Sequence, residues 1–165
     1  MKHIVDLYKI IEKENILYEE TDLSKLKSKG LYMKLEGYKP MIFIDKRIIN
    51  NANTYISILS EELGHYFTTH GDLVEESQSN NDSLIKIKKE NLAHEWASNF
   101  LINNDEFVQA LLDCINTKYD MCEYFNVNYE ILDTKINSIL KDERKYKEIK
   151  ETLKEHEFQY NLCSI

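Results

Sequence analysis

Three residues near the middle of the chain, Glu61, Glu62 and His65, have the types and the spacing of a helix-borne metal site. Residues four apart lie on one face of a helix, so the Glu61 carboxylate and the His65 imidazole can point at one ion. Glu62, three residues before His65, can reach the same metal site. In the usual zinc-peptidase signature, His-Glu-x-x-His, both histidines bind the metal and the glutamate is the general base. Here Glu61 stands at the first histidine position, and zinc accepts carboxylate oxygen as a ligand.

A third ligand has to come from elsewhere, because a catalytic zinc keeps three protein ligands and one open position for water. Glu90 and His94 lie four residues apart in a later helical stretch, and His70 follows the first helix. All three are candidates, and the borderline softness of zinc favours His94 over Glu90. The alternative is a solvated acidic helix face without a metal, because Glu-Glu-x-x-His also arises by chance.

The helix that must carry these residues is predicted from an apolar stripe at helical spacing, starting near Asn51 or Asn53 and stopping near Gly71. A glycine inside such a helix costs about 1 kcal/mol relative to alanine. Gly64 therefore indicates a packing or access requirement beside His65. The residues of the stripe are Ile56, Leu59, Leu63 and Phe67.

The remaining elements follow from hydrophobic patterning. Two β-prone runs, residues 30–35 and 41–44, flank a turn with the only proline and predict a hairpin. Residues 75–83 are polar and predict a loop. The first fourteen residues read as an amphipathic helix, and further helices are predicted over 87–102 (burying Leu92, Trp96 and Phe100), 106–115, 118–124, 129–140 and 141–157. This order suggests a first domain over 1–103 and a C-terminal helical region over 104–165.

Composition limits the class of protein. The 165 residues carry a net charge of −8, which disfavours direct nucleic-acid binding because phosphate contacts need a basic face. The three cysteines are odd in number and far apart, so they suggest neither a disulfide framework nor a thiolate zinc site. Cys114 and Cys122 read as buried small hydrophobes. No signal peptide and no membrane-length apolar run is visible, so we expect a cytoplasmic location and no membrane partner.

The run Ser60-Glu61-Glu62-Leu63-Gly64-His65, with its flanks over residues 58–72, resembles the active-site helix of the ImmA/IrrE metallopeptidases, which are encoded by phages and mobile elements. The family usually shows His-Glu-Leu-Gly-His-Tyr there. The likeness extends to the short strands around residues 29–32 and 41–45, to residues 90–97, and to the helices after Met121. It covers roughly residues 23–140. The departures are Glu61 in place of histidine and Asn103 in place of a frequent proline.

The resemblance implies an α+β, mostly helical fold with a small sheet packed beside a zincin-like active-site helix and a C-terminal helix-turn-helix-like part. It further implies that Glu61, His65 and Glu90 bind Zn²⁺ and that Glu62 is the catalytic base. The implied function is a zinc endopeptidase that cleaves a helix-turn-helix repressor and derepresses phage or mobile-element genes. The alternatives are a catalytically inactive pseudopeptidase acting as an antirepressor and a helical interaction protein without a metal.

Overall fold

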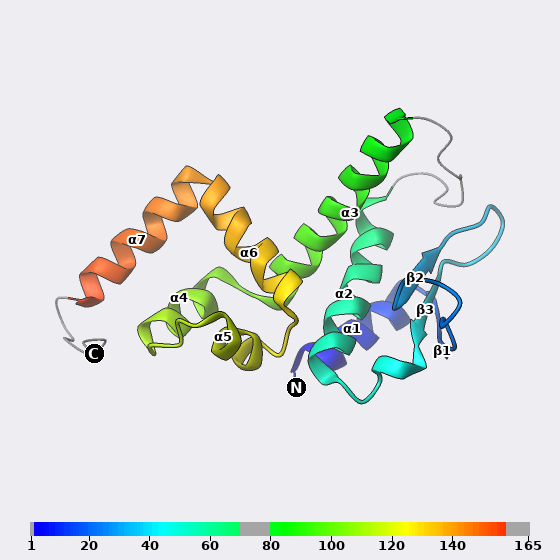
Figure 1. The fold of residues 1–165 in the computed structure, drawn as a ribbon, viewed down its shortest axis with the longest axis horizontal. Helices are drawn as coiled ribbons and strands as arrows, with labels where there is room; N and C mark the ends of the chain where they lie inside the picture. The colour runs from blue at the N-terminus through cyan, green and yellow to red at the C-terminus, as the bar shows by residue number, and fades with distance from the viewer. Residues whose placement is uncertain (1, 70–79, 158–165) are drawn as a thin grey trace.

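The computed structural model describes residues 2–69 and 80–157, and it places a small sheet with three helices at one end and the later helices at the other (Figure 1). The mostly helical α+β fold expected from the sequence is confirmed. The elements in chain order are α1 (Lys2–Lys13), β1 (Leu17–Thr21), β2 (Gly30–Met33), β3 (Met41–Asp45), a 3₁₀ turn η1 (Lys46–Ile48), α2 (Ala52–Thr68), α3 (Asn80–Leu101), α4 (Asn104–Leu112), α5 (Lys118–Phe125), α6 (Tyr129–Lys141) and α7 (Glu143–Glu157).

The sheet has the strand order β1-β3-β2. β2 pairs with β3 antiparallel, with Gly30 opposite Ile44, so the predicted hairpin is confirmed. β1 pairs with β3 in parallel, with Leu17 opposite Met41. The sequence did not predict β1, because its Leu-Tyr-Glu-Glu-Thr composition has only a short apolar start. Pairing with a strand more than twenty residues away stabilises it.

α2 and α3 form the central helix pair, and α2 also packs against the sheet (Figure 1). The predicted stripe of α2 is buried at Ile56, Leu59 and Leu63, whereas Phe67 is 39% exposed. α3 begins at Asn80, so the loop predicted over 75–83 is wrong for 80–83, and its earlier part lies outside the described residues. Leu92 is also exposed, against expectation, although the adjacent Ala93 is fully buried against α2.

The C-terminal helices join the first part of the chain through α6, which packs on α3. Their starts are defined by side-chain caps, as at Thr117 of α5 and Asn128 of α6, which accept hydrogen bonds from backbone N–H groups one turn later. The Asn128 backbone N–H also donates to the Ser57 hydroxyl of α2 at 2.9 Å. One hydrophobic core continues from Leu7 of α1 to Ile139 of α6. The division at residues 103 and 104 stays a prediction.

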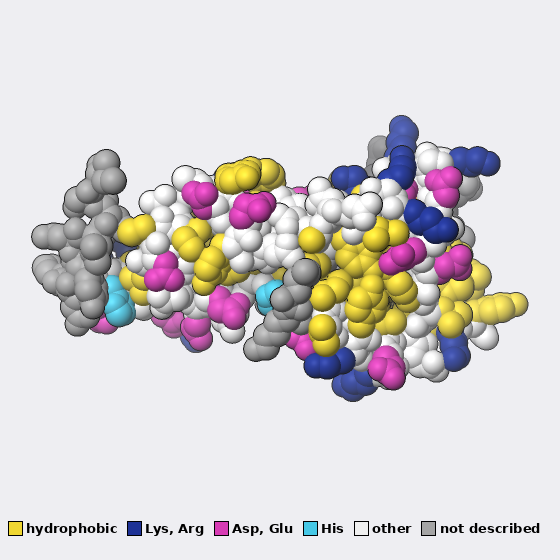
Figure 2. Space-filling model, turned by 90° about the horizontal axis from the view of Figure 1, so that it is seen from below, with side chains coloured by type: hydrophobic (Ala, Val, Ile, Leu, Met, Phe, Trp, Pro, Cys, Tyr) yellow, Lys and Arg dark blue, Asp and Glu magenta, His cyan; other side chains and the backbone are white. Residues whose placement is uncertain are grey.

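Hydrophobic side chains gather into one large patch on the half of the molecule that carries α1, α2 and the sheet (Figure 2).

Cys122 is a buried free thiol as predicted, whereas Cys114 is exposed after α4 and is disulfide-bonded, so the expectation for it is wrong. Among the helices of the described ranges, none has the length and apolarity needed to cross a membrane.

Candidate metal site

Glu61, Glu62 and His65 lie in the second half of α2, where this helix packs against α3. The Asn51 side chain caps α2 by accepting a hydrogen bond from the Thr54 backbone N–H at 3.0 Å, which fixes where the helix starts. The predicted helix is confirmed. Glu61 and His65, one turn apart, face the same neighbour.

Gly64 is a point of close approach between the two helices. A Cβ atom added at Gly64 would lie 2.4 Å from the backbone carbonyl oxygen of Ala93. Ala93 and Ala97 are fully buried at this contact, and both are small. The packing requirement inferred for Gly64 is therefore confirmed. Because the backbones approach so closely, side chains on either edge of the contact reach across it.

Two carboxylate–imidazole pairs span the contact in opposite directions. Glu61 of α2 meets His94 of α3, with 2.9 Å between Oε1 and Nε2. His65 of α2 meets Glu90 of α3, with 3.3 Å between Nε2 and Oε2. Each helix thus contributes one glutamate and one histidine, and the two members of each helix are separated by four residues.

This donor set fits a divalent metal ion. Ligand atoms of Glu61, Glu90 and His94 all lie within 4.8 Å of one another. Imidazole nitrogen and carboxylate oxygen are both good zinc ligands. The predicted ligands Glu61 and Glu90 are therefore brought together, with His94 as the third member, and the predicted ligand His65 lies beside Glu90. The other candidate, His70, lies outside the described residues.

The two ring nitrogens of His65 differ in their surroundings, because Nε2 faces Glu90 whereas Nδ1 is buried and unpaired among the described residues. The side chain is buried, with 8% of the residue exposed, and its Nδ1 has no hydrogen-bond partner among the described residues. A buried polar atom without a partner costs about 1–3 kcal/mol. Metals, ordered waters and ions are the usual remedies for such groups.

The pKa values at the site follow from the crossed pairs. The hydrogen bond from His65 lowers the pKa of Glu90 below its usual value, and burial opposes this change. The hydrogen bond with Glu61 raises the pKa of His94 above its usual value. The first pair thus favours the charged Glu90 carboxylate, and the second favours the protonated His94 imidazole. A metal cation would take the place of the His94 proton, because a ligating imidazole must be neutral.

Glu62 occupies a different environment from its neighbour Glu61. It is 5% exposed, and burial, followed by the charge of Glu61, raises its pKa well above the ordinary value. A hydrogen bond from the backbone N–H of Tyr32 in β2 partly offsets this rise. A Cβ atom at Gly30 would lie 2.3 Å from the Glu62 Oε1 atom. Gly30 therefore leaves the room in which the carboxyl group sits.

Sequence reasoning missed two contributors to the site. Gly30 gives space to Glu62, and its signal would have been a glycine at the start of a predicted strand. Glu130, in the first turn of α6, places its Oε1 atom 3.8 Å from Nδ1 of His94. Nothing in the local sequence connects Glu130 to His94, because the contact depends on how α6 packs against α3.

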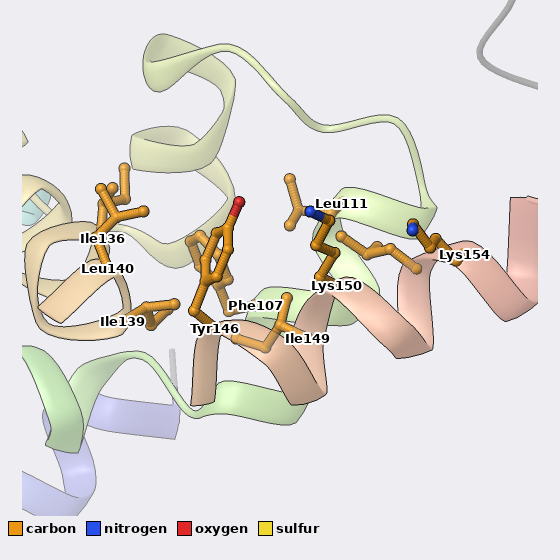
Figure 3. Close-up of a pocket in the computed structure, with 10 residues that line it drawn as sticks. Phe107, Leu111, Ile136, Ile139, Leu140, Tyr146, Ile149, Lys150 and Lys154 are labelled. Atoms are coloured by element: carbon orange, nitrogen blue, oxygen red, sulfur yellow. The ribbon is translucent and has the colours of Figure 1, made fainter. Parts of the chain in front are cut away.

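A separate cavity lies between α4, α6 and α7 (Figure 3). Its volume is about 370 Å³, and its lining is mostly aliphatic and aromatic, including Phe107, Ile136 and Ile149. Lys150 and Lys154 contribute the charged groups of its wall. The cavity is separate from the cluster of α2 and α3, and the side chains that line it within the described part of the chain are apolar or lysine. It can bind an apolar group.

Comparison with protein families gives one match, to the family described as the IrrE N-terminal-like domain, Peptidase M78, over residues 11–137. The matched segment contains β1 to β3, α2, α3 and most of α6, and so includes every residue of the carboxylate–imidazole cluster. Comparisons with curated proteins and with solved structures gave no match.

Proposed function

Because the chain belongs to the IrrE N-terminal-like family of metallopeptidase-like domains, we propose that it is a zinc-dependent endopeptidase acting at the contact between α2 and α3. The observation that carries the proposal is the position of Glu62. Its buried carboxyl group sits beside two carboxylate–imidazole pairs whose atoms can hold a divalent cation. A general base next to a metal site is the arrangement that peptide hydrolysis requires.

In this proposal Glu61, His65 and Glu90 hold the metal. A bound zinc ion would polarise the scissile carbonyl and make an attacking water more acidic. Glu62 accepts the proton from the water and afterwards donates it to the leaving amine. Its raised pKa favours the first step, because a carboxylate with a higher pKa is a stronger base toward the water proton. The Tyr32 backbone N–H orients the carboxyl group.

We propose a helix-turn-helix repressor as the substrate, with the chain working in the cytoplasm, where such a repressor acts. β2 lies at the edge of the sheet, and its residues Gly30 and Tyr32 adjoin Glu62. An extended segment of a substrate can add to such a strand edge through backbone hydrogen bonds. Cleavage would remove the repressor and release the genes of a phage or mobile element.

A second candidate function is suggested by Glu61, which replaces the expected first histidine. A carboxylate in place of an imidazole ligand should lower the affinity of the site for zinc. In that case the same surface would bind the repressor without cutting it, and the chain would be a pseudopeptidase that acts as an antirepressor.

The test is cleavage of the repressor encoded beside the gene for this chain. Purified protein with zinc is expected to give two fragments by mass spectrometry, and a chelator is expected to stop the reaction. Glu62→Gln should keep the fold and the metal while turnover falls about 10²–10⁴-fold, as for other lost acid–base groups. Glu95→Gln is the matched control, because Glu95 is an exposed glutamate of α3.

Equal cleavage by wild type and Glu62→Gln would contradict the catalytic role. A reporter gene in cells separates the two candidate functions. If Glu62→Gln relieves repression as well as wild type does, and no fragments form with either protein, the antirepressor is the correct function.

A further inference from the structure

The contact between Glu61 and His94 bears on the main departure of this sequence from its family. Glu61 stands where the helix motif would have its first histidine. His94 reaches the same place from α3, since its Nε2 atom lies 2.9 Å from Glu61 Oε1. An imidazole donor is thus present at this corner of the site, although it is attached to the other helix.

We propose that His94 takes the coordination place of the missing histidine and that Glu130 of α6 positions its imidazole. This inference rests on the proposed metal site and specifies how this chain completes it. With His94 the donors include two imidazoles, His65 and His94, together with Glu90. Two histidines and one glutamate are an established set for catalytic zinc. His94 thus replaces Glu61, the ligand named in the proposed function, as the donor at this corner, and Glu61 lies beside it.

The two ring nitrogens of His94 face different partners, which supports this assignment. Nε2 points to the carboxylates of the cluster, and Nδ1 lies 3.8 Å from Oε1 of Glu130. Metal-binding histidines usually direct their second nitrogen to a carboxylate, a carbonyl or water, and that partner fixes the ring orientation. A gap of 3.8 Å is longer than a direct hydrogen bond. A bridging water or a small movement of the exposed Glu130 side chain would close it.

The consequence is that the C-terminal helices take part in the metal site. Glu130 lies in the first turn of α6, and α6 packs directly on α3. The Asn128 cap and its contact with Ser57 of α2 hold the start of α6 in place. Removing the Glu130 carboxylate should therefore change the affinity of the site for zinc without changing the fold.

The first experiment measures zinc affinity of the full-length, metal-free chain against a competing chelator. His94→Ala should weaken zinc binding by more than the roughly 10–100-fold typical of a lost orienting partner. The double variant Glu61→His with His94→Ala should regain affinity, because histidine at 61 restores a donor at the same corner. His156→Ala is the matched control, because His156 is an exposed histidine of α7.

The outcomes separate this inference from the proposed function. If wild type binds no zinc, both are overturned. If wild type binds zinc and His94→Ala binds it equally well, only the assignment of His94 is overturned. Failure of Glu61→His to rescue His94→Ala would also contradict it, provided that circular dichroism shows both variants folded.

The second experiment tests Glu130 as a positioning residue. Glu130→Gln should lower zinc affinity about 10–100-fold and should shift the visible spectrum of the Co²⁺-substituted protein, because the orientation and basicity of the His94 ring change. Glu130→Asp should recover part of the affinity, and Glu95→Gln should behave as wild type. An unchanged cobalt spectrum and an unchanged zinc affinity in Glu130→Gln would remove Glu130 from the site.

Discussion

The contact between α2 and α3 and the cavity between α4, α6 and α7 differ in almost every physical respect. At the first, small residues let two backbones touch, and titratable side chains pair across the contact. At the second, long aliphatic and aromatic side chains leave an open space, and its charged groups are lysine ammonium groups at the wall (Figure 3).

The difference shows how one small chain separates chemistry from binding. Hydrolysis needs groups fixed to a fraction of an ångström, and tight packing of helices provides that precision. An apolar cavity tolerates looser placement, because the hydrophobic effect is non-directional. The structure therefore predicts that changes at the first region alter metal affinity, whereas changes at the second alter stability alone.

The largest expected effect comes from Gly64→Ala. Alanine favours a helix by about 1 kcal/mol over glycine, but its Cβ atom would lie 2.4 Å from the Ala93 carbonyl oxygen. Overpacking typically costs about 1–3 kcal/mol. The net change should be destabilising, and separation of the helices should weaken zinc binding about 10–100-fold, as loss of an orienting partner does. Denaturant unfolding and zinc titration measure both; a more stable variant with unchanged affinity would refute the close contact.

A smaller effect is expected from Ile149→Ala on the cavity side. Ile149 of α7 is half-buried and lines the cavity. Truncation should lower the free energy of unfolding by about 1–3 kcal/mol, toward the low end for large-to-small changes because the site is only partly buried. Zinc affinity should equal that of wild type. A loss of zinc affinity in this variant would mean that the two regions are coupled.

The smallest effect is expected at Lys135 of α6, which lies between the two regions. It is 2% exposed and donates a hydrogen bond from Nζ to Asn99 Oδ1 of α3 at 3.0 Å. Burial, followed by the charge of Lys145, lowers the pKa of Lys135 to about 8. The lowered pKa means that the charged form destabilises the fold, fully below pH 8 and less as the pH rises toward 10.5, the ordinary value.

Lys135→Met should therefore raise the melting temperature at pH 7, and this gain should shrink between pH 8 and pH 10.5. Thermal unfolding followed by circular dichroism at several pH values checks the sign. A gain that is the same at every pH would show that the lysine charge does not destabilise the fold.

Much of the fold followed from local patterning. The helix around Glu61, its start near Asn51 or Asn53, and the hairpin were predicted, because hydrophobic periodicity and capping residues act over a few positions. β1 and the start of α3 were not. β1 exists because β3 pairs with it, and residues 84–88 of α3, with Leu84 and Ile85 among them, are exposed.

The site was predicted as far as helical spacing reaches. Glu61 with His65, and Glu90 with His94, could each be placed on one face, but how the two faces meet depends on the contact at Gly64. The crossed pairing and the approach of Glu130 arise from tertiary packing, for which the sequence has no local signal. The choice between Glu90 and His94 stayed open for the same reason.

The most direct test of the account is the position of zinc in crystals of the full chain, located by anomalous scattering at the zinc absorption edge. The account predicts one strong peak between α2 and α3, about 2.0–2.2 Å from imidazole nitrogen and carboxylate oxygen atoms, with Glu90, His65 and His94 around it. Zinc found only at surface positions, with the crossed pairs Glu61–His94 and His65–Glu90 intact at saturating zinc, would contradict it.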